Sequence, residues 1–215
     1  MIKKNMKTLI LTTVIALLPM VVGIVIWDQL PHQMATHFNF QGKPDGYSSK
    51  WVTVFVIPLA LVLLEWVSAL FTAHSPKSED ISNKVFKLVL WMIPLISLMV
   101  MIIVYGYALG LKLNMTLIAN VFMGALLLVI GNYLPKTRQN YVIGIRLPWT
   151  LADEENWTRT HRFASRLWTI IGTVILIMTI AYHLSMMAGL ILVLMAVFIP
   201  TIYSFILYRN KKRAS

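Results

Sequence analysis

The chain of 215 residues contains no cysteine, and this absence removes several kinds of chemistry at once. Without cysteine there is no disulfide, no thiol nucleophile and no thiolate ligand for a metal. Acidic residues are also scarce, with 8 Asp and Glu against 19 Lys and Arg. The sequence has no G-x-S-x-G, P-loop or dinucleotide-binding pattern either. We therefore expect no enzymatic activity and no bound cofactor.

The five histidines do not follow a metal-binding pattern. None has the H-E-x-x-H spacing of a zinc enzyme. Glu154 and His161 lie two helical turns apart, but they offer two groups where a zinc site needs three or more. We expect no metal site.

Charged residues are missing from several long stretches of the chain. Residues 167–208 form a run of 42 without Asp, Glu, Lys or Arg, and similar runs cover residues 8–27, 88–111 and 113–135. Each is long enough to cross a bilayer core, which takes about 20 helical residues. The 42-residue run is twice that length, and its polar break at residues 183–185 predicts a tight helical hairpin.

The composition agrees, because 58% hydrophobic and 13% charged residues leave too few polar groups to cover a soluble globule. We predict an all-α integral membrane protein with six transmembrane helices. Their expected ranges are about 8–27, 52–73, 88–110, 114–132, 166–183 and 187–207.

The basic residues indicate how such helices would be oriented. If the segments alternate across the membrane, sixteen of the 19 Lys and Arg fall on one side, and Lys43, Lys50 and Lys112 fall on the other. Cytoplasmic loops carry the excess of Lys and Arg, so we predict that both termini are cytoplasmic. The net charge of +11 is then a topology signal, and we expect no direct contact with nucleic acid.

Two loops are too patterned to be simple connectors, and the first, residues 28–50, is predicted to be extracellular. Residues 34–40 alternate, which would place Met34, Thr36, Phe38 and Phe40 on one face of an extended segment. The sequence of residues 42–46, G-K-P-D-G, is typical of a tight turn. Two interpretations are open. The loop is either a lid that only packs the helix ends or an exposed recognition surface formed by His37, Asn39, Asp45, Tyr47 and Lys50.

The second patterned loop, residues 132–165, is predicted to be cytoplasmic and structured. Thr150 is expected to be the N-cap of a helix that continues into the fifth span, with Asp153 in the capping-box position. Trp149, Trp157 and Trp168 would suit the headgroup level of a membrane. An interfacial anchor and a protein-docking surface are both compatible with this pattern.

These two loops resemble a known family. L-P-H-Q-M-A-T-H-F-N-F-Q-G-K-P-D-G-Y-S-S-K-W, at residues 30–51, resembles the extracellular signature of a bacterial domain of unknown function. The pattern G-N-Y-x-P-K, then N-Y-x-x-G-I-R-x-P-W-T-L, then E-x-x-W-x-x-T-H-R, at residues 131–162, is similar to the hallmark of the SdpI immunity proteins. The resemblance divides the chain into an N-terminal membrane region, residues 1–75, and an SdpI-like membrane region, residues 76–215, with its cytoplasmic motif at 131–168.

The resemblance implies a protein of the bacterial cell membrane that protects its cell against a secreted, membrane-targeting peptide toxin. It also implies a second role, in which toxin binding lets the protein hold a small DNA-binding autorepressor at the membrane. The candidates for toxin binding are His37, Phe38, Asn39, Asp45 and Tyr47. The candidates for docking the repressor are Asn140, Gly144, Arg146, Pro148, Trp149, Thr150, Glu154, Trp157, His161 and Arg162.

Glu65 is the only acidic residue within an expected span. A carboxylate in hydrocarbon costs at least a few kcal/mol, so such a residue faces an interior, a partner or water. A hydrogen bond to a neighbouring helix and a protonatable or ion-binding site are both open.

A small membrane transporter or channel is the alternative function. It would need polar groups along a path through the membrane, and polar residues in the spans are few. This scarcity favours binding over transport.

Overall fold

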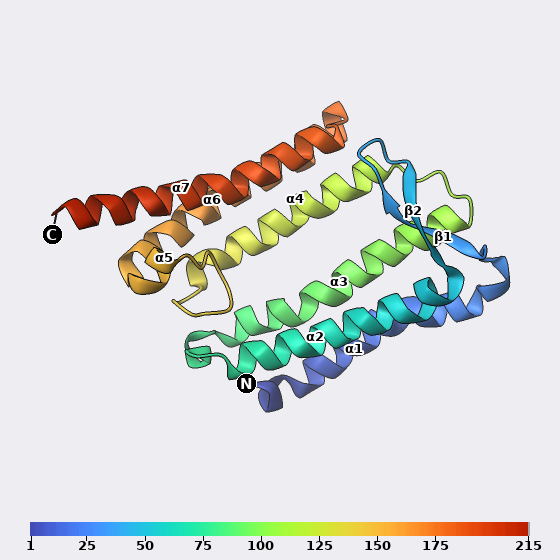
Figure 1. Cartoon of the computed structure of the whole chain (residues 1–215), viewed down its shortest axis with the longest axis horizontal. Coiled ribbons are helices and arrows are strands. Elements are labelled where there is room, and N and C mark those ends of the chain that lie inside the picture. The colour runs from blue at the N-terminus through green and yellow to red at the C-terminus, as the bar shows by residue number, and fades with distance from the viewer. Residues whose placement is uncertain (215) are drawn as a thin grey trace. The chain divides into compact units, whose positions relative to one another are not determined.

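The computed structural model describes residues 1–214, and the chain is mostly helical (Figure 1). The long helices are α1 (Ile2–Val25), α2 (Ile57–His74), α3 (Asn83–Ala108), α4 (Met115–Tyr133), α6 (Glu154–Tyr182) and α7 (Met186–Ala214). A short helix, α5 (Pro148–Ala152), precedes α6, and a π-helical turn, Val52–Val56, leads into α2. Two antiparallel strands, β1 (Gln33–Phe38) and β2 (Pro44–Ser49), form a hairpin between α1 and α2.

Six helices among residues 1–214 are long and apolar enough to cross a membrane, which confirms the expected number. The first and last helices extend beyond the expected spans. Helix α1 begins at Ile2 rather than near residue 8, and α7 continues to Ala214 rather than ending near residue 207. Lys and Arg are good helix formers, so the helices continue beyond the apolar segments into basic residues. The predicted cytoplasmic location of both termini stays a prediction.

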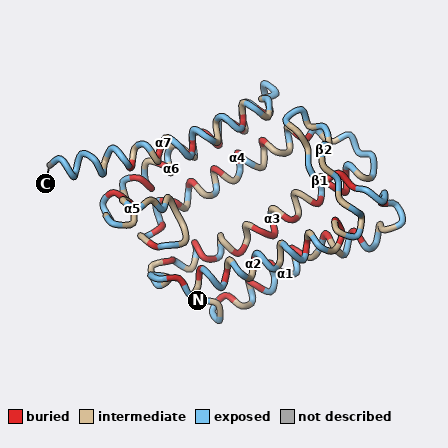
Figure 2. The backbone as a smooth tube through the Cα atoms, in the orientation of Figure 1, coloured by how far each residue is buried: buried red, intermediate tan, exposed pale blue. Residues whose placement is uncertain are grey.

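Large apolar side chains cover the outside of these helices. Val25, Leu63 and Ile180 are 78%, 66% and 67% exposed, and Figure 2 shows exposed residues along every long helix. Soluble monomers rarely expose so many large apolar side chains along their helices. The exposed apolar side chains and the six long apolar helices together indicate a multi-pass membrane protein.

The chain divides into two compact units. The first contains residues 1–74 and 86–115, and the second contains residues 75–85 and 116–215. The boundary expected between residues 75 and 76 concerned sequence regions rather than packing, and it stays a prediction.

In the first unit, α1, α2 and α3 pack together, and the hairpin lies where α1 ends and α2 begins (Figure 1). Buried polar contacts join the helices: the Ser97 hydroxyl donates to the carbonyl of Ala16 at 3.1 Å, and the Tyr105 hydroxyl donates to that of Pro19 at 2.9 Å. Gly23 permits the second contact, since a Cβ there would collide with the Tyr105 hydroxyl.

In the second unit, α4 packs with the helical pair α6 and α7. The break between α6 and α7 falls at residues 183–185, as the sequence predicted. His183 ends α6 with a left-handed backbone (φ 51°). Asn120 on α4 secures the turn, because its amide donates to the carbonyl of Leu184 at 2.9 Å.

Candidate functional site

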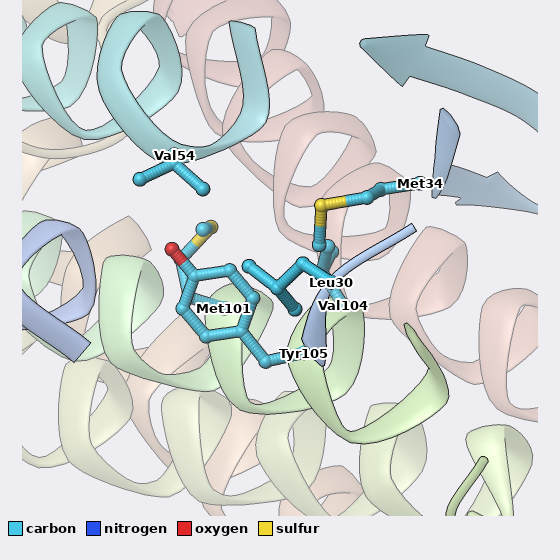
Figure 3. Packing of buried hydrophobic residues seen from close by; sticks show 6 residues of the cluster. All are labelled: Leu30, Met34, Val54, Met101, Val104 and Tyr105. Atoms are coloured by element: carbon cyan, nitrogen blue, oxygen red, sulfur yellow. The ribbon is translucent and has the colours of Figure 1, made fainter. Parts of the chain in front are cut away.

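The first candidate surface is the hairpin, which is anchored mainly through its first strand. Met34 of β1 is buried in a cluster with Leu30, Val54, Met101, Val104 and Tyr105, which come from the chain before β1, the π-helical turn and α3 (Figure 3). Phe38 packs edge-on against Tyr107 of α3, with 5.3 Å between ring centroids. These contacts hold β1 to α3 and leave β2 outside.

The expected alternation of β1 is wrong. Met34 and Ala35 are both buried, and the register shifts between Ala35 and His37 and again between His37 and Phe38. The bulge moves Thr36 out of the ladder, so the period of two does not continue along the strand. Phe40, expected on the same face as Met34, is 51% exposed.

Lys50 ties the second strand to the end of α1. Its ammonium donates to the carbonyls of Trp27 and Leu30 at 3.0 Å each. It also lies 4.6 Å from the centroid of the Trp27 ring, which adds a cation–π interaction. Lys50 was expected on the exposed recognition surface, but it is only partly exposed, and its role here is to satisfy carbonyls in the segment that follows α1.

The five toxin-binding candidates differ in how far they are free to meet a ligand. His37 and Asp45 face each other across the strands, with their side-chain N and O atoms 2.5 Å apart, and both are exposed. Tyr47 is 58% exposed. The side chain of Asn39 accepts from the backbone N–H groups of Gln41 and Lys43, both at 3.0 Å.

The hairpin therefore presents a connected polar pair and one tyrosine. Asn39 stabilises the turn and Phe38 packs the hairpin against α3, so these two candidates have a structural role in the hairpin. Gly42 is part of the same turn, with φ 73°, a backbone conformation that glycine adopts readily.

The second candidate surface is the loop between α4 and α6, which we call the inner loop (residues 134–153). Most of its backbone belongs to no regular element, and buried side chains hold it in place. Asn140 is completely buried: its amide donates to the carbonyls of Arg138 and Ile143, and its oxygen accepts from the N–H groups of Val142 and Ile143.

Trp157 and His161 of α6 form the floor of the inner loop. Both are 1% exposed and their rings stack with centroids 4.0 Å apart. The Trp157 indole donates to the carbonyl of Thr137 at 2.8 Å. His161 Nδ1 lies 2.8 Å from the carbonyl of Trp157, and its Nε2 accepts from the N–H of Ile145 at 3.0 Å. This pattern fits the neutral ring with its proton on Nδ1.

Gly144 lets the loop pass over these rings. Its φ is 121°, and a Cβ there would collide with Nε2 of His161 and approach the Trp157 ring to 3.0 Å. Close approach and an unusual backbone conformation both require glycine at this position.

The expected N-cap at Thr150 is wrong. Asp153 caps α6, because its side chain accepts from the N–H groups of Glu155 and Asn156. Thr150 is buried in α5, where its hydroxyl accepts from the N–H of Leu147 and lies 2.8 Å from the carbonyl of Ile145. Pro148 begins this separate short helix, and the sequence analysis missed that start signal.

Helix α7 completes this surface. Trp149 donates from its indole to the hydroxyl of Ser204 at 2.9 Å, and the Asn156 amide donates to the backbone carbonyl of Ser204 at 3.0 Å. Lys211 lies 2.9 Å from the carboxylate of Asp153, and the hydrogen bond from Lys211 is the main reason that the pKa of Asp153 lies below its ordinary value of 3.8.

The ten docking candidates therefore fall into two groups. Asn140, Thr150, Trp157 and His161 are buried, and Gly144 and Trp149 are partly buried within the same packing. Arg146, Pro148, Glu154 and Arg162 are exposed. Gln139, which the sequence analysis did not select, links the carbonyls of Thr150 and Leu151 to Lys77 through its side chain.

Glu65 lies apart from both surfaces, in the interior of the first unit. It is 1% exposed, and its Oε2 lies 3.4 Å from the hydroxyl of Thr13 on α1. This places it between helices and not in lipid. No group of three His, Asp or Glu side chains that could hold a metal ion occurs among residues 1–214.

Comparison with known proteins finds separate matches for the part of the chain with the hairpin and for the part with the inner loop. Residues 136–204 match the SdpI/YfhL protein family, and residues 14–62 match DUF1648, a domain of unknown function. The ten docking candidates lie within that SdpI/YfhL region, and the five hairpin candidates lie within the DUF1648 region.

The chain is also similar to the immunity protein SdpI of Bacillus subtilis (strain 168). The two are 28% identical over 212 residues, which cover 95% of this chain and 98% of that protein. No solved structure matches the chain significantly.

Proposed function

We propose that this chain is a membrane immunity protein that protects its cell against a secreted, membrane-active peptide toxin. The observation that carries the proposal is the end-to-end similarity to the immunity protein SdpI, which covers 95% of this chain and 98% of that protein. The similarity therefore includes the spans, the hairpin and the inner loop, and not one region alone.

The hairpin is the proposed toxin-binding surface. In the proposed orientation it lies outside the cell, where a secreted peptide arrives first. It combines an exposed ionisable pair, His37 and Asp45, with the exposed aromatic ring of Tyr47. Aromatic and charged groups of this kind supply much of the energy in protein recognition.

A growth assay tests this surface. Cells sensitive to the culture fluid of the source organism, or of Bacillus subtilis strain 168, are given the intact chain or a double variant, His37→Ala with Tyr47→Ala. We expect the intact chain to restore growth and the double variant to restore little, at equal amounts in the membrane. Gln41→Ala is the matched control, because Gln41 is an exposed neighbour whose contact with Asn39 uses only its backbone.

Full protection by the double variant would remove the hairpin from the proposal. Failure of the intact chain to protect against any such culture fluid would remove immunity itself. Ion movement by the purified chain in proteoliposomes would favour the transporter instead.

The proposed orientation has its own test. Reporter fusions after Lys50 and Lys112 should report the outside, and fusions after Arg146 and Ser215 the inside. A fusion at Arg146 that reports the outside would contradict the orientation and would place the inner loop on the wrong side for a cytoplasmic partner.

We extend the proposal to the inner loop as a docking surface for a small autorepressor. Its exposed candidates are Arg146, Pro148, Glu154 and Arg162. Arg146→Ala and Arg162→Ala should release a co-expressed repressor from the membrane fraction while the chain itself stays folded. Unchanged retention in both variants would leave the inner loop without this role.

A further inference from the structure

Glu65 is a buried acid without a positive partner. It is 1% exposed, and none of the ion pairs among residues 1–214 involves it. Its Oε1 atom is buried and accepts no hydrogen bond. Ionised carboxylates in such surroundings are normally paired with a cation or with several donors.

The donors near Glu65 are too few to replace a cation. The hydroxyl of Thr13 lies 3.4 Å from Oε2, which is long for a hydroxyl donor. Thr12 stands next to it on α1 and is also close enough to contribute, but its hydroxyl carries a single hydrogen and already lies 3.0 Å from the carbonyls of both Thr8 and Leu9. The indole of Trp66 points to Thr13 and donates to its hydroxyl at 3.0 Å.

From this geometry we propose that Glu65 is a proton-binding site inside the membrane-spanning part of the chain. The carboxyl group holds its proton while α1 and α2 are packed together. A metal cation is a poorer occupant, because a hard cation needs several oxygen ligands. Here the Thr13 hydroxyl oxygen already accepts from the Trp66 indole, which leaves it less free to act as a ligand. The proposal does not depend on immunity.

A protonated acid in an apolar site has a specific chemical signature. The lipid-soluble reagent dicyclohexylcarbodiimide adds the acid O–H across one of its C=N bonds, so a C–O bond forms and the proton moves to nitrogen. The acyl group then migrates from oxygen to nitrogen and gives a stable N-acylurea. No atom leaves, and the protein gains the mass of one reagent molecule.

The full-length protein in liposomes is treated with this reagent at neutral pH, and the adduct is located by mass spectrometry. We expect one adduct, on Glu65, and Glu65→Gln should lower total labelling by about tenfold or more because the other acids are ionised in water. Glu79→Gln is the matched control, since Glu79 is exposed and should contribute no labelling.

Infrared spectroscopy gives a second readout that does not depend on access of the reagent. The spectrum of the intact protein minus that of Glu65→Gln should contain the carbonyl band of a protonated carboxylic acid. Absence of that band would overturn the proposal, whatever the labelling shows. Protection of Glu65 by sodium or potassium ions would also overturn it, in favour of a cation site.

Discussion

The hairpin and the inner loop are both structured connections, but opposite kinds of contact hold them. The hairpin is held by its strand ladder and by a few anchors, and it leaves His37, Asp45 and Tyr47 exposed. The inner loop has almost no ladder and depends on buried side chains such as Asn140 and Trp157. Substitution of the exposed hairpin residues should therefore change recognition, whereas substitution of the buried residues that hold the inner loop should change folding.

The largest effect is expected for Trp157→Ala. This change removes a buried indole, its hydrogen bond to Thr137 and its stacking on His161. The expected loss is about 3–5 kcal/mol of stability, seen as earlier thermal unfolding in detergent and faster protease cleavage within residues 134–153. Trp51→Ala is the control on the hairpin side, because Trp51 is 61% exposed. Equal losses in the two variants would break the comparison.

Two asparagines allow the same comparison with one residue type. Asn140→Ala removes four hydrogen bonds from a completely buried site, so we expect a loss of about 2–3 kcal/mol. Asn39→Ala removes two bonds at the half-exposed tip of the hairpin, and we expect about 1 kcal/mol. Chemical unfolding of both variants against the parent chain measures the difference. A larger loss for Asn39→Ala would show that the hairpin turn matters more than the structure indicates.

A smaller effect is expected at the start of α6. Asp153→Ala removes the N-cap and should cost about 1 kcal/mol, whereas Thr150→Ala should act through α5 and the inner loop instead. Because the folded pKa of Asp153 is lowered, its contribution is complete at neutral pH and is lost as the pH falls below about 4. Thermal unfolding across that pH range should show a weaker acid dependence in Lys211→Met. Identical profiles in Lys211→Met and the parent would exclude Lys211 as the cause of the lowered pKa.

The smallest effect on stability is expected in the hairpin itself. Tyr47→Ala and His37→Ala change exposed side chains, and each should alter stability by no more than about 0.5 kcal/mol. Thermal unfolding measures this directly, on the same samples that are tested for protection. Loss of protection together with a large loss of stability would mean that these residues stabilise the hairpin and do not bind a ligand.

The spans could be predicted from the sequence because hydrocarbon imposes a simple length and composition rule. The break at residues 183–185 followed in the same way from polar residues in an otherwise apolar run. The ends of α1 and α7 were missed because basic residues both end an apolar run and continue a helix. The length of an apolar run therefore indicates the part of a helix that lies in hydrocarbon, and not the residues at which the helix begins and ends.

The candidate site was only partly predictable. Thr150 and Asp153 are both good N-cap residues, and only the separate helix started by Pro148 decides between them. The bulge at Thr36 depends on packing both Met34 and Ala35 inward, and no residue in the strand signals it. The wrapping of a loop around Asn140 depends on tertiary packing, which has no sequence period.

The π-helical turn Val52–Val56 joins the hairpin to α2 with one residue more than an α-helical turn would need. Each residue of an α-helix corresponds to about 100° of rotation about its axis. If the same residues were wound as regular α-helix, with no residue removed, the hairpin would rotate about the axis of α2 by roughly that angle. Lys50 would then no longer face the end of α1, and Val54 would leave the cluster with Met34. These five residues thus set the direction in which the hairpin faces relative to α2, and a change from π-helical to α-helical winding would re-aim the hairpin without altering a single side chain on it.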